Sequence, residues 1–586
     1  MENQNLNLFC EGERGNAEPS KSRIRAMLEE VVFYAIILVG TLLLFLVLKP
    51  YYYVNSAVSD GVVAHGCMTV LIVALVIYGV YLALSGKLDR KTAIMLLFFV
   101  GIVLRIFYML CTPITVRQHD TFNKSNTGHE AYAWTIFSTG KLPQRNDYQF
   151  YHPPLNALIQ SAFMKAMEWF SGALTDIFGL EGYFPDRFLQ NYSSARLPEG
   201  SEQRFFLFST CQVLAVTYSV ITCVYMLKLV NLFDFKGKTA VIVSAFVILF
   251  PRNIQFAGMV NNDALSFMFS VLALYCALKW QREGKKLPYI LLCALFCGLG
   301  MMTKLATATI CLPIAGIFIY EFVLKLIALI KAYKQGKKGE LKSFIAFCMQ
   351  FVCFVVICAP IALWFQVYVK IKFDQGFGFV FDNLNHRLGT DHHSLFERLF
   401  VAFDLEEYFG SVFCIPFYKE DSVGNITQFN HYNLFNYSLR SALFGEFTLK
   451  GGEGFAVVSI VLAYAFSLLL MIGIIKSLMT YWGYCRCKNV VFSKVKIEFK
   501  DFLTLFLLVQ SQVIPEIMFY IKMPYACTMD FRYIMPMIFA MAIMLGLVNK
   551  ILVAEGSKFS LKLNTATNIT AVSLLVCTTV LYMVCI

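Results

Sequence analysis

Histidine and carboxylate side chains gather in one short part of an otherwise apolar chain. His119-Asp120 is followed by His129-Glu130, and the stretch Tyr151-His152-Pro153-Pro154-Leu155 comes next. Histidine titrates near neutral pH, and a positioned carboxylate accepts a proton during a reaction. This grouping indicates acid–base chemistry around Asp120, although a solvated loop pair is the simpler interpretation of His119 and Asp120.

Other charged residues fall near the ends of apolar segments further along the chain. Asp263 follows Asn261-Asn262, Lys304 comes after a glycine-rich apolar segment, and Arg532-Tyr533 opens a late one. Ionisable groups beside hydrocarbon are costly and commonly functional, yet a lysine near a helix end also reaches water simply by extending its side chain. Asp263, Lys304 and Arg532 are therefore candidate functional residues.

The composition excludes a soluble protein. Of the 586 residues, 58% are hydrophobic and 15% are charged, and the mean hydropathy is +0.62. Soluble domains carry roughly 25% charged residues, and 56 Phe with 30 Tyr are too many for a disordered chain. The net charge of +12 comes largely from Lys and Arg in short loops between apolar segments, so no nucleic-acid partner is expected.

The apolar segments predict an all-α polytopic membrane protein of about thirteen spans, because a spanning helix needs about 20 mostly apolar residues. With a cytoplasmic N-terminus, every basic cluster falls in loops on one side, as the positive-inside rule requires. The expected spans are 28–49, 62–84, 92–112, 206–231, 238–256, 263–280, 288–303, 305–328, 343–366, 456–477, 501–521, 531–549 and 568–586.

This orientation places two long loops, 113–205 and 367–455, on the outer face of the membrane. Loops of such length are usually functional. Pro153-Pro154 suits the start of a helix, and residues 155–170 are expected to form an amphipathic helix on the membrane surface. We expect the second loop to shape an acceptor site.

The order of these loops and motifs resembles the GT-C superfamily of membrane glycosyltransferases, in particular its family 39-like branch of protein O-mannosyltransferases and aminoarabinose lipid A transferases. The matching features are an acidic residue in the first outer loop, Pro-Pro-Leu opening a helix, Asn262-Asp263 at a span end and Lys304 after a glycine-rich span. The resemblance covers about residues 92–549 and implies a GT-C-type catalytic bundle there. Residues 1–27 then form a cytoplasmic tail, 28–91 add two spans, and 550–586 hold a cytoplasmic loop and the last span.

The resemblance also assigns roles to individual residues. Asp120 matches the catalytic base and Asp263 the second acidic position. The residues expected to contact a lipid-linked donor phosphate are His152, Lys304, Arg532 and Tyr533, and those expected to support them are His119, His129, Glu130 and Tyr151. The related aminoarabinose enzymes have Lys where His152 stands and Glu where Tyr151 stands, so a metal site of their kind is not expected. The sequence requires no cofactor, and a divalent cation stays open.

Together these features indicate an inverting glycosyltransferase of a plasma membrane, with its C-terminus outside and its active site on the outer face. Nucleotide sugars are absent from that face, so the donor would be a polyprenyl-phosphate sugar and the acceptor an envelope glycan, lipid or protein. Two alternatives stay open. One is a transporter or lipid flippase with a charged outward cavity, and the other is an inactive relative that acts as a scaffold.

Overall fold

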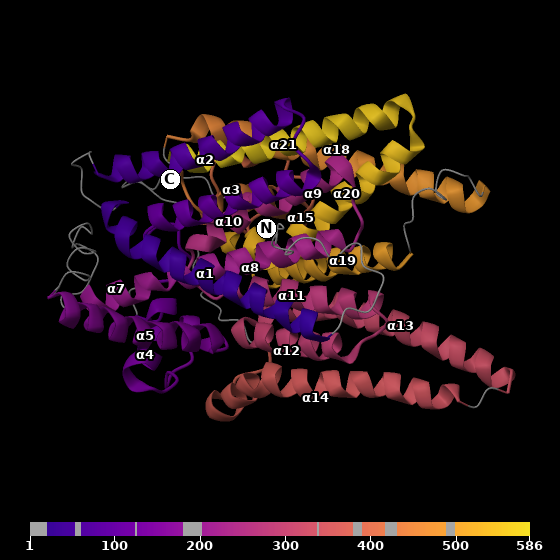
Figure 1. Cartoon of the computed structure of the whole chain (residues 1–586), viewed down its shortest axis with the longest axis horizontal. Helices are drawn as coiled ribbons and strands as arrows, with labels where there is room; N and C mark the ends of the chain where they lie inside the picture. Colours follow the sequence, from indigo (N-terminus) through magenta and orange to yellow (C-terminus); the bar gives the residue numbers. More distant parts are fainter. Residues whose placement is uncertain are drawn as a thin grey trace.

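The computed structural model describes residues 20–52, 60–122, 126–179, 202–336, 339–378, 389–416, 431–449, 451–487 and 499–585. Within these ranges the regular structure is helical, and the single β-type contact is an isolated antiparallel bridge between Gly389 and Tyr525. Most of the long helices run roughly along one common axis (Figure 1). The all-α expectation is confirmed.

Eleven described helices are long and apolar enough to cross a membrane, which confirms a multi-pass membrane protein. One of these spans combines the short helix α7 (Glu202–Thr210) with α8 (Gln212–Asn231). The other ten are α1 (Ser20–Tyr52), α2 (Asp60–Leu84), α3 (Arg90–Cys111), α11 (Asp263–Arg282), α13 (Ala308–Lys334), α14 (Glu340–Phe373), α18 (Glu453–Cys487), α19 (Phe499–Lys522), α20 (Met537–Glu555) and α21 (Lys558–Cys585).

The two remaining expected spans differ from a plain helix. Segment 238–256 is a bent pair, α9 (Gly237–Leu249) and α10 (Pro251–Gln255), with a bend of 44°. Pro251 lacks the amide hydrogen that would continue the first helix. Segment 288–303 is α12 (Leu287–Thr303), which has 17 residues, fewer than the roughly 20 of an ordinary span.

The expected start of span 531–549 was wrong. Residues Phe531–Ile534 form a separate 3₁₀ turn, η9, and α20 begins only at Met537, after Pro536. The Asp530 side chain accepts the backbone N–H of Arg532 at 3.2 Å, so a local cap closes the turn before the helix starts. Arg532 therefore lies in a turn ahead of the span.

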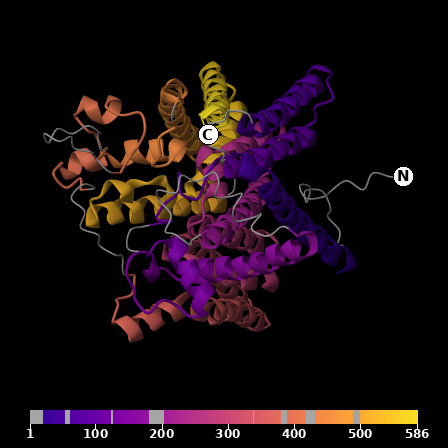
Figure 2. The same cartoon turned by 90° about the vertical axis from the view of Figure 1, so that its left-hand side faces the viewer.

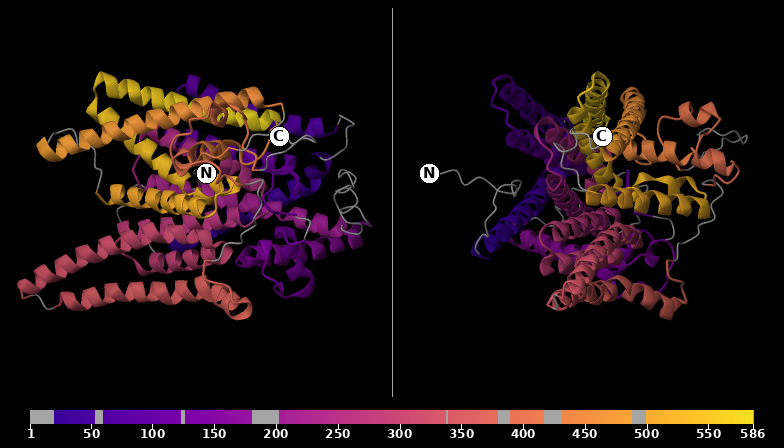
Figure 3. Two further views of the ribbon diagram at one scale, coloured as in Figure 1. Left: turned by 180° about the vertical axis from the view of Figure 1, so that it is seen from behind. Right: turned by 90° about the vertical axis from the view of Figure 1, so that its right-hand side faces the viewer.

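The segments between spans carry their own helices. The first long loop contains α4 (His129–Thr139) and α5 (Leu155–Phe178), and the second contains α15 (Leu395–Leu399), α16 (Leu405–Phe409) and α17 (Leu434–Phe444). Helices α4, α5 and α7 lie at one end of the bundle (Figure 1), and Figure 2 looks onto that end. At the opposite end, α13 and α14 extend as a long hairpin (Figure 3).

Helix α11 is the centre of the bundle, and its most apolar 18-residue window is completely buried. It packs against α8 and α12, and α12 packs in turn on α14. A Cβ atom on Gly300 of α12 would lie 2.5 Å from Thr307 Cγ2 and 3.3 Å from Phe269 Cβ. Glycine at this position allows the chain to fold back closely after α12, and this return sets the position of Lys304.

We predict that Gly300→Ala destabilises the protein, because the added methyl group forces Thr307 and Phe269 apart, and overpacking of a core typically costs about 1–3 kcal/mol. Thermal unfolding of the purified protein in detergent measures the effect as a lower Tm. Gly40→Ala in α1 is the matched control, since a Cβ there meets nothing within 4 Å. Equal Tm values for the two variants would contradict the close packing at Gly300.

Candidate functional site

Lys304 and Asp263 form an ion pair where the start of α11 meets the end of α12. Both side chains are largely buried, at 12% and 4% exposure. Asn261 Nδ2 donates to Asp263 Oδ2 at 2.9 Å, which fixes the carboxylate, and the N-terminus of a helix favours a negative charge. The structure thus holds Lys304 as an oriented cation beside a carboxylate.

Arg532 and Tyr533 lie against the same pair. Lys304 Nζ is 4.9 Å from the centre of the Tyr533 ring, and Arg532 donates to the Tyr533 hydroxyl at 3.0 Å. The Arg532 side chain is 8% exposed. Two cations from segments far apart in the sequence therefore lie against one tyrosine ring.

These side chains border a cleft between α11, α13, α19 and the turn before α20. Four residues predicted from the sequence line it, namely Asp263, Lys304, Arg532 and Tyr533. The remaining lining residues are Ser266, Phe267, Ser270, Ala306, Thr307, Thr309, Gln512, Met535 and Pro536. A cleft with a lysine and an arginine on its wall suits an anion such as a phosphate.

Asp120 lies beside this cleft on a tightly closed loop. Its side chain is 54% exposed, and Oδ2 is 3.8 Å from Arg532 Nη1. The backbone has φ of +54°, which Asp adopts more readily than most residues. The Asp120 carbonyl accepts the His129 N–H at 2.9 Å, and a Cβ on Gly128 would lie 2.2 Å from Thr121 O. Glycine at 128 is required for this closure, which presents the Asp120 carboxylate to solvent.

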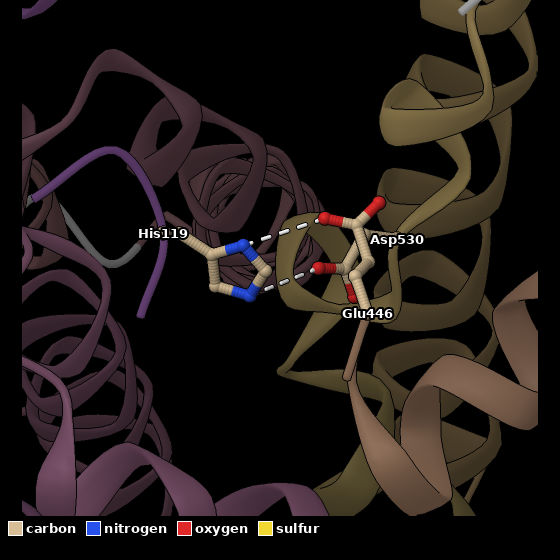
Figure 4. A group of neighbouring side chains, drawn as sticks. All are labelled: His119, Glu446 and Asp530. Carbon is tan, nitrogen blue, oxygen red and sulfur yellow. Dashed lines mark ion pairs between the residues drawn. The ribbon is translucent and has the colours of Figure 1, made fainter. Parts of the chain in front are cut away.

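His119, the residue before Asp120, is buried between two carboxylates (Figure 4). His119 Nδ1 is 3.3 Å from Glu446 Oε2, and Nε2 is 3.5 Å from Asp530 Oδ2. Arg252 Nη2 donates to both Asp530 oxygens, at 2.8 and 2.6 Å, and lies 3.1 Å from His119 Nε2. The Tyr437 hydroxyl donates to Glu446 Oε1 at 2.5 Å. This carboxylate cluster (His119, Glu446, Asp530 and Arg252) joins the first long loop to the second and to the Arg532 turn.

Three members of the carboxylate cluster, Arg252, Glu446 and Asp530, were not predicted from the sequence. The position of Arg252 could have indicated its role, because an arginine inside an apolar segment needs a buried partner. Asp530 stands two residues before Arg532 in the same short motif. No sequence feature indicated the role of Glu446, since its partner His119 is more than three hundred residues away in sequence.

His119, Glu446 and Asp530 offer ligand atoms within 4.8 Å of one another, close enough to hold a metal ion. Asp530 is already ion-paired with Arg252 in the structure. A Cβ on Gly445 would lie 2.1 Å from Arg252 Nη1, so glycine makes room for the guanidinium. A divalent cation would have to displace Arg252, and we therefore assign no metal to this cluster.

Three further predicted residues form an aromatic group next to the Asp120 loop. The His129 and His152 rings stack with centroids 5.9 Å apart, and the Tyr151 ring is 4.2 Å from that of His152. Burial lowers the pKa of His129 to about 4 and also lowers the pKa of His152. His152 is then a neutral imidazole outside the lining of the cleft, and its contact with a phosphate stays a prediction.

Glu130 and His119 differ in their surroundings. Glu130 is buried and forms a two-pronged ion pair with Arg204 of α7, which ties α4 to α7.

Burial lowers the pKa of His119, and the nearby Arg532 and Arg252 lower it further. In contrast, burial and the Asp530 carboxylate raise the pKa of Glu446. Neutral His119 can therefore donate a hydrogen bond to one carboxylate without adding charge to the cluster.

Residues 169–374 match the family described as dolichyl-phosphate-mannose-protein mannosyltransferase. Over these residues the match confirms the predicted resemblance to GT-C glycosyltransferases, and it supports an enzyme that uses a lipid-phosphate sugar. It includes Asp263 and Lys304, and it extends neither back to Asp120 nor forward to Arg532. Among curated proteins, none matches the chain.

We predict that His129 makes the native protein less stable as the pH falls. In the unfolded chain histidine titrates near 6.5, whereas the folded-state pKa is about 4. Between these values the unfolded state binds more protons, so stability is lost as the pH is lowered through this window, by about 3 kcal/mol in all. Tm measured at pH 7 and at pH 4.5 should fall less in His129→Gln than in the native chain. An equal fall in both proteins would contradict a buried, neutral His129.

Proposed function

We propose that this GT-C-type membrane glycosyltransferase is an inverting enzyme that acts on the outer face of a plasma membrane. The donor is a polyprenyl-phosphate sugar, and the acceptor is a hydroxyl group of an envelope glycan, lipid or protein. The basic loops favour a cytoplasmic N-terminus and an outer position for both long loops. The family match supports the lipid-phosphate donor in its coarse form.

The observation that carries the proposal is the contact between Asp120 and Arg532. Asp120 is exposed enough to meet an acceptor, and the guanidinium 3.8 Å from it lines the cationic cleft. A general base and a phosphate-binding cation therefore stand side by side. The contact brings the acceptor hydroxyl and the donor phosphate into one site, which a transfer between them needs.

In the proposed reaction the acceptor oxygen forms a bond to the anomeric carbon while the bond from that carbon to the phosphate oxygen breaks. The acceptor proton passes to Asp120, and the bonding electrons leave with the phosphate. Lys304 and Arg532 stabilise the charge that develops on the phosphate. Attack from the face opposite the leaving group inverts the anomeric centre.

Asp263 acts through Lys304 in this scheme. Its carboxylate fixes the ammonium group at the cleft, and a positioned cation loses less entropy on binding phosphate than a mobile one. His119 holds the loop that carries Asp120, because its ring is bound between Glu446 and Asp530. These two residues are positioning groups of the proposed site.

A transporter or flippase would place its functional charges at mid-membrane depth, commonly between paired broken helices. In the part of the chain that the structure describes, α9–α10 is the one bent pair. Helices α4 and α5, of 11 and 24 residues, are the next two α-helices after Asp120 in the sequence. Both features favour a transferase over a transporter.

The test compares envelope glycans by mass spectrometry in a deletion strain of the source organism that carries no plasmid, the native chain or Asp120→Asn at matched protein level. We predict that one sugar is lost on deletion and restored by the native chain only, because removal of a general base typically lowers the rate about 10²–10⁴-fold. Asp147→Asn is the control, since Asp147 forms an exposed ion pair with Arg145, and this variant should restore the sugar. Full restoration by Asp120→Asn would remove the base assignment and favour transport or scaffolding.

A further inference from the structure

Two short helices of the second long loop, α15 and α16, expose their apolar side chains. Five large apolar residues in these helices and in the link between them are 53–82% exposed, namely Phe396, Phe400, Phe403, Leu405 and Phe409. The centroid of the Phe396 ring lies 5.4 Å from that of Phe400 and 6.2 Å from that of Phe403. This part of the chain projects to one side of the bundle (Figure 2). We call the five residues the aromatic patch.

Two charged side chains of the same segment point into the protein. Arg398 is 7% exposed, and Glu407 is completely buried. Arg398 donates to Tyr520 O at 3.5 Å, and the Glu407 carboxylate accepts the backbone N–H groups of Tyr432 and Asn433 at 3.0 and 3.3 Å. A segment surrounded by water buries its rings and exposes its charges. The reversed arrangement here indicates an apolar surrounding medium.

The backbone of this segment is satisfied by side chains of the protein. Short helices leave most of their carbonyl groups without an intrahelical partner. Asn433 Nδ2 donates to Glu397 O at 2.7 Å, and Arg440 donates to Tyr408 O at 2.5 Å and also to Ser411 O. Irregular backbone beside lipid is tolerated only where protein groups satisfy its polar atoms. These three carbonyl groups meet that condition.

The aromatic patch adjoins the lipid-facing side of α19. Arg398 joins α15 to the carbonyl of Tyr520, and two neighbours of Tyr520 in sequence, Met518 and Ile521, are 64% and 46% exposed. Helix α19 is long and apolar enough to cross the membrane, so its exposed apolar side chains contact acyl chains. The aromatic patch therefore continues an apolar surface that lipid already covers.

Acidic residues beside the aromatic patch limit its depth. Glu406 is exposed and Asp404 is partly buried, and Asp404 caps α16 by accepting the Glu406 N–H at 2.9 Å. A carboxylate is costly in hydrocarbon, so these two residues belong among the lipid headgroups. Interfacial helices bury their apolar face about 5–10 Å into the boundary between headgroups and acyl chains. The rings of the aromatic patch can reach that depth while the carboxylates stay hydrated.

We propose that the aromatic patch inserts into the membrane and anchors the second long loop at the boundary between headgroups and acyl chains. Asn433 joins α15 to α17, which it caps, and Ser441 of α17 accepts the Phe531 N–H at 2.9 Å. Phe531 directly precedes Arg532, so the anchor also sets the height of the cationic cleft relative to the lipid surface. The proposal depends on the multi-pass fold and is independent of the proposed transferase function.

The experiment uses photocrosslinking of the full-length protein in phosphatidylcholine nanodiscs. The photoreactive analogue p-benzoylphenylalanine is incorporated in place of Phe403, whose exposed ring leaves room for it, and lipid adducts are measured by mass spectrometry of the peptides. The same analogue in place of Met518 reports a lipid-facing position of α19. We expect the yield of lipid adducts at position 403 to lie within about threefold of that at position 518, because both side chains contact acyl chains.

Tyr333 is the matched control, because its side chain is 80% exposed, like those of the aromatic patch. It lies about 38 Å along α13 from Ala308, past the roughly 30 Å of hydrocarbon. The analogue at position 333 should give about tenfold less lipid adduct than at position 403. Equal yields at positions 403 and 333 would show that the aromatic patch faces water and would overturn the proposal. A crosslink from position 403 to a second copy of the chain, in place of lipid, would overturn it as well.

Discussion

The site depends on ion pairs between buried side chains, because an unpaired charge in the interior of the protein is energetically unfavourable. Arg532 lies 3.8 Å from Asp120 and 3.5 Å from Asp530, and it lines the cleft that also contains Lys304. Breaking a buried ion pair by removing one partner typically costs 3–5 kcal/mol, because the remaining charge is left uncompensated. Arg532 is therefore the group through which the Asp120 loop, the carboxylate cluster and the cleft constrain one another.

This constraint explains why residues from distant parts of the chain converge. The carboxylate cluster takes His119 from the first long loop, Arg252 from α10, Glu446 from the second long loop and Asp530 from the turn before α20. Each element leaves the bundle near the same end, and none could bury its charged group alone. The packing of α11, α12 and α14 then fixes the Asp263–Lys304 pair relative to this cluster.

Much of the architecture follows from apolar length alone. All thirteen expected spans fall on helices, and the two irregular ones contain a proline break or too few residues, both of which are visible in the sequence. Asp263, Lys304 and Arg532 could be selected from the sequence because ionisable groups beside hydrocarbon are costly and commonly functional. The boundary at 531 was misplaced because hydropathy cannot distinguish a capped turn from the first turn of a span.

The tertiary partners of these residues could not be predicted. Glu446 stands in a stretch with no motif, and only the fold brings it to His119. The neutral state of His129 depends on burial, which a loop position does not reveal. These unpredicted contacts determine how the residues of the candidate site are arranged.

The most direct test of the account is the affinity of the native chain and of Arg532→Gln for dolichyl phosphate in nanodiscs. The account predicts clear binding by the native chain and about a tenfold or greater loss in the variant, since a charge-assisted hydrogen bond to phosphate is worth roughly 1.5–3 kcal/mol. The native chain should also bind dolichyl phosphate far better than dolichol, which lacks the phosphate. Equal affinity of the native chain and Arg532→Gln for dolichyl phosphate would contradict the role of Arg532 at the centre of the site.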